Sequence, residues 1–412
     1  MVACVLAAAA GAARAAPPTE AEVADLRARL EQSLRLIDQL NQRVQALEKA
    51  AAPAPAAPGE WGSAVTRRVG DLEEEVNALS TRSNTQEGIP LHGFLDVGAL
   101  GTSQRGAVRK GATVDGLDLY LTTENGRVRS LTELNFEVSP EGEIETDIER
   151  LQIGYAFSDA LTLWAGRFHS PYGYWNTAYH HGAQIQPSIL RPRFLDFEDK
   201  GGILPAHDVG LWATGKLALG DRTLRYDGWL ANAPRIDASG VLDQNEAGAT
   251  NGHVLVGANL GLPIGAASVG VHALGGRIGG PVDGQSAADL RILGGYAVYE
   301  DDDWEAMVEY FGFDDRNVQG RDTHSSHAAY AHVGHVFGAW TPYVRYEFAS
   351  LAQADDYFAL MANGQSYRRG LFGLRYDIDP RSTVKLEFDY TRLTDRIQDN
   401  YHESRIQYAI RF

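Results

Sequence analysis

The stretch that decides the fold is His402-Glu-Ser-Arg-Ile-Gln-Tyr-Ala-Ile-Arg-Phe412. Its side chains alternate, because Ile406, Tyr408 and Ile410 fall on one side of an extended chain and polar groups such as Arg405 fall on the other. A period of two residues is that of a β-strand. The pattern therefore predicts a strand with one apolar side and one polar side.

The same alternation recurs upstream, over residues 340–350. Trp340 and Val344 share one side of this segment, whereas Arg345 and Glu347 share the other. Apolar residues that filled a soluble core would not explain why the opposite side is charged. We therefore expect strands that face lipid outside and a polar lumen inside, as in a transmembrane β-barrel. A soluble all-β fold is the weaker alternative.

Alternating segments of about ten residues, each bounded by turn residues, fill the chain from residue 90 onward. They lie near 90–101, 114–124, 127–138, 144–157, 160–168, 206–218, 222–232, 251–262, 266–276, 288–299, 303–313, 325–337, 340–350, 367–377, 381–394 and 402–412. An even number of strands is usual when both ends of a bacterial barrel are periplasmic. The sequence thus predicts an all-β fold, a 16-stranded antiparallel transmembrane β-barrel over residues 90–412.

The links between these segments alternate in length. Tight links such as Asn125-Gly126 and Gly338-Ala339 follow even-numbered segments, whereas most links after odd-numbered segments are long. The link after the third segment is a short exception. Short periplasmic turns and long external loops are typical of outer-membrane barrels. The alternation therefore favours a barrel over a soluble β-sandwich.

Composition excludes several classes of protein. The 412-residue chain has a formal net charge of −17, which argues against a nucleic-acid partner because phosphate binding needs an excess of Lys and Arg. After residue 16 no apolar run approaches the roughly 18 residues that a spanning helix needs. The only cysteine, Cys4, lies in a predicted signal peptide, so we expect no disulfide in the mature chain.

The first part of the chain is expected to be separate from the barrel. Residues 1–15 are rich in Ala and end at the small-x-small site Ala13-Arg-Ala15, which predicts a secretory signal peptide. Residues 20–49 carry apolar a and d heptad positions, which predicts an α-helical coiled coil in the periplasm. Residues 50–60 form an Ala/Pro linker, and residues 61–89 are expected to be a short helical segment and a linker.

One segment carries a resemblance to a known family. Leu163-Trp-Ala-Gly-Arg-Phe-His-Ser-Pro-Tyr-Gly173 resembles the Gly-x-Phe-x-x-Pro-Phe/Tyr-Gly segment of the phosphate-selective porin O and P family. A start like Gly93-Phe-Leu-Asp96 and an N-terminal coiled coil also occur in that family. The resemblance implies a member of the bacterial outer-membrane porin superfamily. However, residues 90–412 contain 28 basic and 42 acidic residues, the wrong sign for a dedicated anion channel unless the acids lie in external loops.

The last strand carries a second resemblance. It is similar to the C-terminal strand of bacterial outer-membrane proteins, which ends in Phe and is read by the barrel-assembly machinery. The resemblance assigns this role of assembly signal to Tyr408, Ile410 and Phe412.

The longest link, residues 169–205, is expected to be functional because long loops in compact proteins usually are. In 16-stranded porins the corresponding loop folds into the lumen and narrows it, and the resemblance implies the same here. The candidate residues of this pore constriction are Arg191, Arg193, Asp196, Glu198, Asp199 and Lys200.

Basic residues on the inward side of the last strands form a second candidate site. They are Arg345, Arg369, Arg375, Lys385 and Arg405. One interpretation is a basic wall opposite the acidic loop, with a transverse field that orients polar solutes. The other is that these charges pair with inward carboxylates such as Glu347 and Asp389 and merely fill a polar interior. The sequence leaves both open.

Three histidines are candidate metal ligands. His180 and His181 are adjacent and His169 is nearby, and imidazole suits Zn, Cu and Ni. Adjacent histidines on a loop rarely present both rings to one ion, and no third ligand is fixed by spacing. The sequence therefore predicts no metal site and no cofactor.

The leading functional hypothesis is a passive diffusion channel, not an enzyme, for small hydrophilic or ionic solutes in the bacterial outer membrane. A structural or partner-binding barrel, which anchors the cell wall or sheathes another protein, is the alternative. An outer-membrane hydrolase is less favoured, since no Ser/His or Asp/His constellation stands out in the strands. Expected partners are outer-membrane lipid and lipopolysaccharide, the barrel-assembly machinery and two further copies of the chain in a homotrimer.

Overall fold

The computed structural model describes residues 91–104, 107, 110–138, 142–243, 252–282, 284–394 and 400–412. The predicted signal peptide, coiled coil, Ala/Pro linker and short helical segment lie outside the described residues. Within the described part of the chain, no helix has both the length and the apolar character needed to cross a bilayer.

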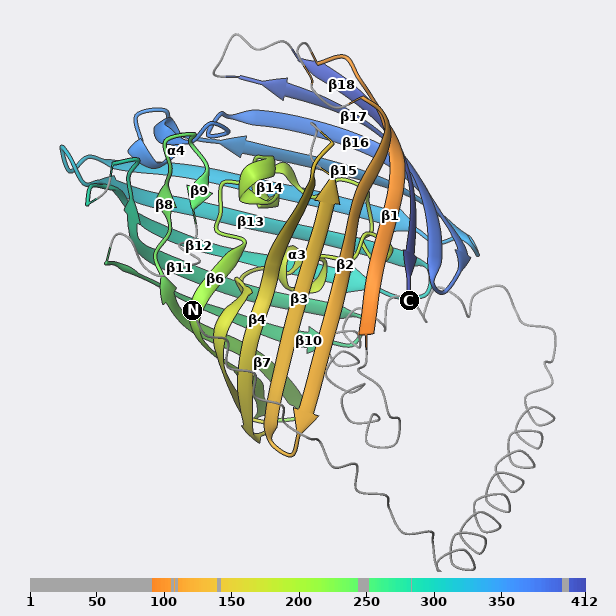
Figure 1. The fold of residues 1–412 in the computed structure, drawn as a ribbon, viewed down its shortest axis with the longest axis horizontal. Helices are drawn as coiled ribbons and strands as arrows, with labels where there is room; N and C mark the ends of the chain where they lie inside the picture. Colours follow the sequence, from red (N-terminus) through yellow and green to blue (C-terminus); the bar gives the residue numbers. More distant parts are fainter. Residues whose placement is uncertain are drawn as a thin grey trace, which may run out of the picture. The chain divides into compact units, whose positions relative to one another are not determined.

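Sixteen long strands form a closed antiparallel sheet, which confirms the predicted 16-stranded barrel (Figure 1). The strands are β1 (Leu91–Thr102), β2 (Gly111–Asn125), β3 (Val128–Val138), β4 (Ile144–Ser158), β5 (Leu161–His169), β6 (His207–Leu219), β7 (Arg222–Asn232), β10 (Val254–Ile264), β11 (Ala267–Gly279), β12 (Ser286–Glu300), β13 (Trp304–Asn317), β14 (Thr323–His335), β15 (Trp340–Ser350), β16 (Tyr367–Asp379), β17 (Ser382–Leu393) and β18 (Tyr401–Arg411). β1 pairs with β18 from Phe94↔Arg411 to Thr102↔Glu403 and so closes the cylinder.

The two ends of the barrel differ. At one end, which we call the turn end, short turns join β2 to β3 and β4 to β5. At the other, the loop end, lie the long connections. One connection contains the two-residue strands β8 (Arg235–Ile236) and β9 (Leu242–Asp243), and another contains helix α4 (Asp356–Leu360). The predicted segments missed β8 and β9 because two residues carry no detectable period.

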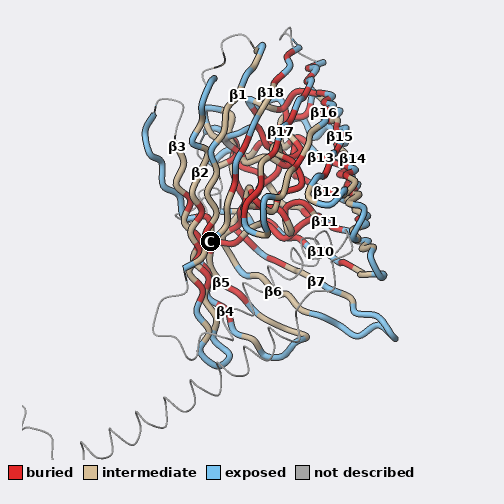
Figure 2. The backbone as a smooth tube through the Cα atoms, turned by 90° about the vertical axis from the view of Figure 1, so that its right-hand side faces the viewer, coloured by how far each residue is buried: buried red, intermediate tan, exposed pale blue. Residues whose placement is uncertain are grey.

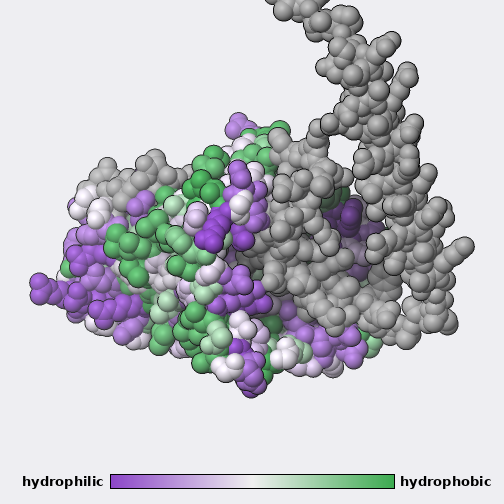
Figure 3. Space-filling model, turned by 90° about the horizontal axis from the view of Figure 1, so that it is seen from below, coloured by the Kyte–Doolittle hydropathy of each residue, from purple (hydrophilic) through white to green (hydrophobic). Residues whose placement is uncertain are grey.

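The pleat of the strands sorts the side chains by polarity. In β15, Val344 and Tyr346 are 56% and 52% exposed on the outer face, whereas Arg345 and Glu347 are 2% and 0% exposed on the inner face. The outer face therefore presents apolar groups. Apolar residues gather over the middle of the barrel wall and hydrophilic residues at its left end (Figure 3).

The interior is partly filled by the connection between β5 and β6, residues 170–206, which we call the lumen segment. It contains helix α3 (Trp175–Ala178) and the 3-10 turns η2 (Arg193–Leu195) and η3 (Glu198–Lys200). Its buried aromatic residues pack with inward aromatics of the wall, for example Trp175 with Tyr330 and Phe194 with Phe311. Buried stretches accordingly lie inside the sheet as well as along it (Figure 2).

Candidate functional site

Carboxylates of the barrel wall hold the lumen segment in place. Glu309 on β13 accepts hydrogen bonds from the backbone N–H groups of Tyr174 and Trp175, at 2.8 and 2.6 Å. The Tyr330 hydroxyl donates a third bond to Glu309 at 2.6 Å. Because Glu309 is fully buried, these three donors replace the water that the carboxylate loses.

The conformation of Gly173 makes this contact possible. Its φ of +67° lies in the left-handed region, where a side chain is strained. A Cβ atom at this position would also lie 2.5 Å from Glu309 Oε2. The motif Leu163–Gly173 therefore needs glycine at its last position because the carboxylate of Glu309 approaches the start of α3 closely there.

A second carboxylate, Glu387 on β17, holds the middle of the lumen segment. It accepts hydrogen bonds from the N–H groups of Ile189 and Leu190, at 3.0 and 3.2 Å. Glu347 on β15 accepts from the N–H of Arg193 at 3.1 Å. Inward glutamates of three strands thus bind the backbone of the segment, in addition to the hydrogen bonds within the segment itself.

The predicted basic wall residues lie on the inner face, and three of them also bind this segment. Arg345 Nη1 donates to the Leu190 carbonyl at 2.8 Å, and Lys385 Nζ donates to the Ala183 carbonyl at 2.5 Å. Arg375 reaches a third carbonyl of the segment at 3.4 Å. These three cations therefore satisfy carbonyl groups of the lumen segment.

The other two basic wall residues pair with wall acids. Arg369 Nη1 lies 3.3 Å from Glu347 Oε1, and Arg405 Nη1 lies 2.6 Å from Asp389 Oδ1. Such pairs are what the polar-filling interpretation expects.

The predicted constriction residues occupy different surroundings. Arg191 is buried, donates to the Leu195 carbonyl at 2.9 Å, and its guanidinium lies over the Phe197 ring, 4.3 Å from the centroid. Arg193 Nη1 donates to the Tyr401 hydroxyl on β18 at 3.0 Å. These two residues tie the lumen segment to itself and to the wall.

The remaining constriction candidates lie around η3. Asp196 is half-buried and lines a hollow of the lumen. Glu198 is buried and accepts a hydrogen bond from the N–H of Ala206. Lys200 Nζ lies 2.5 Å from Glu137 Oε1 on β3. Asp199 belongs to η3, and its side chain lies outside the described residues.

A large hollow remains between the lumen segment and strands near the turn end, and we call it the turn-end hollow. Its volume is about 1200 Å³, and it reaches the turn residues Gly126, Asp159 and Pro380. Two acidic side chains line it, Asp159 and Asp227. Seven basic side chains line it: Arg127, Arg129, Arg150, Lys216, Arg225, Arg381 and Arg411.

A smaller hollow of about 350 Å³ lies toward the loop end, and we call it the loop-end hollow. Three of its lining residues are basic: Arg191, Lys200 and Arg405. Five are acidic: Asp96, Asp115, Asp118, Glu137 and Asp196. The two hollows of one lumen thus carry opposite excess charge.

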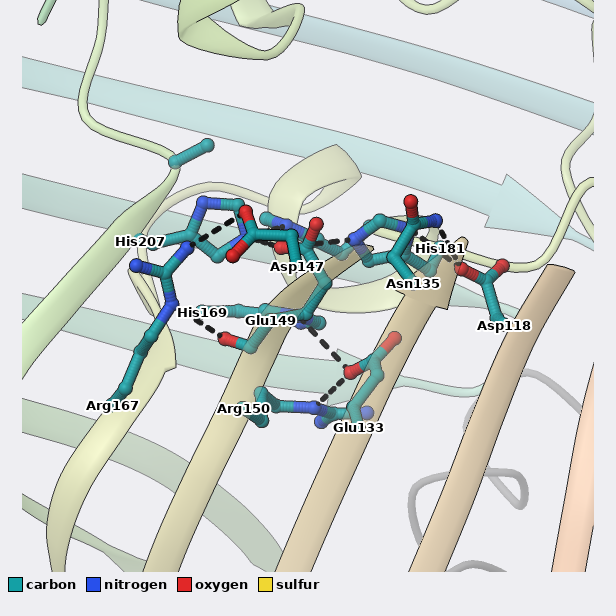
Figure 4. A network of polar contacts seen from close by, with 12 residues as sticks. Asp118, Glu133, Asn135, Asp147, Glu149, Arg150, Arg167, His169, His181 and His207 are labelled. Atoms are coloured by element: carbon teal, nitrogen blue, oxygen red, sulfur yellow. Dashed lines mark hydrogen bonds and ion pairs between the residues drawn. The ribbon is translucent and has the colours of Figure 1, made fainter. Parts of the chain in front are cut away.

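A cluster of histidines and carboxylates includes His169, His181, His207 and Glu149, which lie close together in the lumen (Figure 4). His180 and His181 line both hollows. Together with His169, His207 and Glu149, they bring one potential ligand atom each to within 4.8 Å of one another. The spacing of residues along the chain does not identify His207 or Glu149 as members of this cluster. Only the register of the β-sheet and the folding of the lumen segment bring these two residues close to His180 and His181.

The two adjacent histidines differ in their electrostatic surroundings. Burial lowers the pKa of His180 well below its ordinary value, and neighbouring cationic groups act in the same direction. Burial also lowers the pKa of His181, but the carboxylates of Asp118 and Glu149 outweigh it and raise that pKa above its ordinary value. Burial therefore favours the neutral imidazole of His180, whereas the nearby carboxylates favour the protonated form of His181.

Comparison with known proteins adds information on the fold alone. No family model and no curated protein sequence matches the chain, so the resemblance to the phosphate-selective porin O and P family is not confirmed.

Several solved structures share the architecture at low sequence identity. An anion-selective porin from Comamonas acidovorans aligns with a TM-score of 0.55 and 10% identity over 79% of this chain and 99% of that one. OmpT, an outer-membrane protein of Vibrio cholerae, gives 0.54 and 10% over 79% and 97%. The outer-membrane channel DcaP of Acinetobacter baumannii gives 0.53 and 10% over 80% and 99%. The chain therefore has the porin-type barrel fold of outer-membrane proteins.

Proposed function

We propose that this protein is an outer-membrane channel through which small hydrophilic solutes diffuse, with anions preferred at its turn end. One observation carries the proposal: inside a barrel with an apolar exterior lies a hollow of about 1200 Å³ with seven basic and two acidic lining residues. Clefts lined by one sign of charge concentrate ions of the opposite sign.

The proposed constriction is the space left beside the lumen segment. This segment occupies the side of the lumen next to β12–β17, where wall glutamates hold its backbone. Solutes would pass along the opposite side, where Arg191 and Lys200 meet residues of β1–β3 in the lining of the loop-end hollow. The barrel fold and its porin neighbours support an outer-membrane location, with the turn end toward the periplasm as is usual for such barrels.

Reversal potentials in planar bilayers test the proposal. The full-length protein in a KCl gradient is expected to conduct and to prefer chloride. The double variant Arg225→Glu/Arg381→Glu reverses two charges of the turn-end hollow, so its preference is expected to fall and turn toward cations. Arg321→Glu makes the same kind of charge change in an exposed residue outside both hollow linings and is the control.

Two results would contradict the proposal. A protein that inserts but gives no steady conductance would favour the structural or partner-binding barrel, for which the apolar cluster inside the lumen is the supporting observation. A channel whose selectivity is the same in the double variant and the wild type would remove the role of the basic lining.

We further propose that the barrel assembles as a homotrimer in contact with outer-membrane lipid and lipopolysaccharide. The predicted coiled coil, which lies outside the described residues, and the porin-type fold are both compatible with three chains. Mass measurement of the intact complex in detergent tests this state, and a monomeric mass would contradict it.

The assembly-signal role of the last strand is also a proposal. Phe412 exchanges backbone hydrogen bonds with Gly93, both at 3.1 Å, at the seam where β1 meets β18. Loss of Phe412 is expected to lower the amount of folded barrel in the outer membrane. Val282→Ala, an exposed loop substitution, should leave that amount unchanged.

A further inference from the structure

We infer that the histidine cluster between the hollows is a binding site for a first-row divalent transition-metal ion. The ligands are His180 and His181 from the lumen segment, His207 from β6 and Glu149 from β4. His169, whose ring stacks on that of His180 with centroids 3.5 Å apart, completes the cluster.

The separations between the ligand atoms fit one ion. His180 Nε2 lies 3.0 Å from His207 Nε2, and His207 Nε2 lies 2.5 Å from Glu149 Oε2. His181 Nε2 lies 3.5 Å from the same Glu149 oxygen. A tetrahedral ion with bonds of about 2.1 Å holds its ligand atoms about 3.4 Å apart. The observed separations bracket that value, so small shifts would seat an ion.

The second nitrogen of each ring faces an oxygen, as is usual for metal-bound histidines. His180 Nδ1 lies 2.9 Å from Asn176 Oδ1, which leaves Nε2 as the free lone pair when Nδ1 donates. His181 Nδ1 lies 3.4 Å from Asp118 Oδ1. These contacts turn the Nε2 atoms of both rings toward Glu149.

His207 repeats the arrangement on the other side of the cluster. Its Nδ1 lies 3.8 Å from Glu198 Oε2. In all three imidazoles, Nδ1 therefore faces an oxygen atom and Nε2 faces the centre of the cluster. Such an arrangement orients ligands, and at His180, where the contact is a hydrogen bond, it also fixes the tautomer before an ion arrives.

The polar atoms at the centre face one another inside a buried cluster. Glu149 Oε2 lies 2.5 Å from His207 Nε2 and 3.5 Å from His181 Nε2, and His180 Nε2 faces His207 Nε2 at 3.0 Å. Two ring nitrogens that face each other can share only one hydrogen, and buried polar atoms that are poorly satisfied cost free energy. One divalent cation would satisfy Glu149 Oε2 and the Nε2 atoms together.

The donor set selects the class of ion. Three imidazole nitrogens and one carboxylate oxygen suit Zn²⁺, Ni²⁺ or Cu²⁺, whereas Ca²⁺ and Mg²⁺ prefer oxygen ligands alone. Access is available, because His180 and His181 line both hollows. Zinc is the natural probe, since it imposes no geometry of its own through d electrons.

Calorimetric titration of the full-length protein in detergent, stripped with a chelator, tests the inference. Wild type is expected to bind one Zn²⁺ per chain. His180→Gln and Glu149→Gln each keep side-chain bulk but remove a ligand, so each is expected to weaken zinc binding at least about tenfold. His335→Gln, which changes a histidine outside the cluster, should bind as wild type does.

The inference is overturned if wild type binds no zinc, or if the ligand variants bind it as tightly as His335→Gln. A second measurement needs no variant to fold. Electron paramagnetic resonance of wild type loaded with one equivalent of Cu²⁺ should show hyperfine coupling to at least two imidazole nitrogens. A spectrum with oxygen ligands only would equally overturn the site.

Discussion

The two hollows of the lumen differ in charge although they belong to one barrel. The turn-end hollow has seven basic and two acidic lining residues, and the loop-end hollow has three basic and five acidic ones. The chain as a whole carries −17. The net charge of the chain therefore says little about the electrostatic field inside each hollow, because residues at opposite ends of the same strands line different spaces.

Strand β3 illustrates the separation. Arg129 near its turn end lines the larger hollow, whereas Glu137 at its loop end lines the smaller one. Both point inward, since they are eight residues apart and side chains of equal parity share a face. The lumen segment and the histidine cluster lie between these two levels.

The largest expected effect comes from releasing the lumen segment, because that would merge the two hollows. Glu309→Ala/Glu387→Ala removes the carboxylates that bind the N–H groups of Tyr174, Trp175, Ile189 and Leu190. Single-channel conductance should rise severalfold, and each lost carboxylate should cost about 3 kcal/mol of stability.

The matched control is Glu305→Ala, on the same strand as Glu309, where the Glu305 carboxylate lies 3.2 Å from His332 Nε2 on the neighbouring strand. This variant should leave conductance unchanged. Equal conductance in the double variant and wild type would mean that the segment does not narrow the pore.

A smaller effect is expected from zinc, which would place an ion at the boundary between the hollows. Micromolar Zn²⁺ should reduce the conductance of wild type by obstructing the route beside His180 and His181. His180→Gln should be insensitive. Zinc that binds in calorimetry without any change in current would place the metal site off the solute path and leave the site itself intact.

The smallest expected effect comes from neutralising the loop-end hollow. Asp115→Asn/Glu137→Gln removes two of its five acids, so anions should enter more easily and the preference for chloride should rise about twofold. Asp322→Asn, an exposed acid outside both linings, is the control. A rise in cation preference would contradict the assignment of charge to the two hollows.

The sequence predicted the barrel wall well because its signal is local. A period of two residues marks each strand, so all sixteen long strands were expected, and β15 was placed at its observed bounds, Trp340–Ser350. The ends of β11 and β12 extend two residues or more into a link predicted at 277–287, since strand pairing can continue where side chains no longer alternate.

The interior was harder to predict because its contacts join distant parts of the chain. In the sequence, Glu309 and Glu387 cannot be distinguished from other acidic residues on the inner face. Only the folded lumen segment gives their carboxylates backbone N–H partners. His207 and Glu149 lie on separate strands and carry no motif. Inward Arg345 was predicted, but its bonds to carbonyls of the segment were not.

The wall glutamates that bind backbone N–H groups have a consequence for engineering. A loop from another barrel, grafted between β5 and β6, would have to present its own amide groups at the positions of Glu309, Glu347 and Glu387. Any mismatch would leave a buried carboxylate without hydrogen-bond donors. The lumen segment and the barrel wall therefore depend on each other, and the proposed permeability is easier to change by altering side chains that line the hollows than by exchanging the segment.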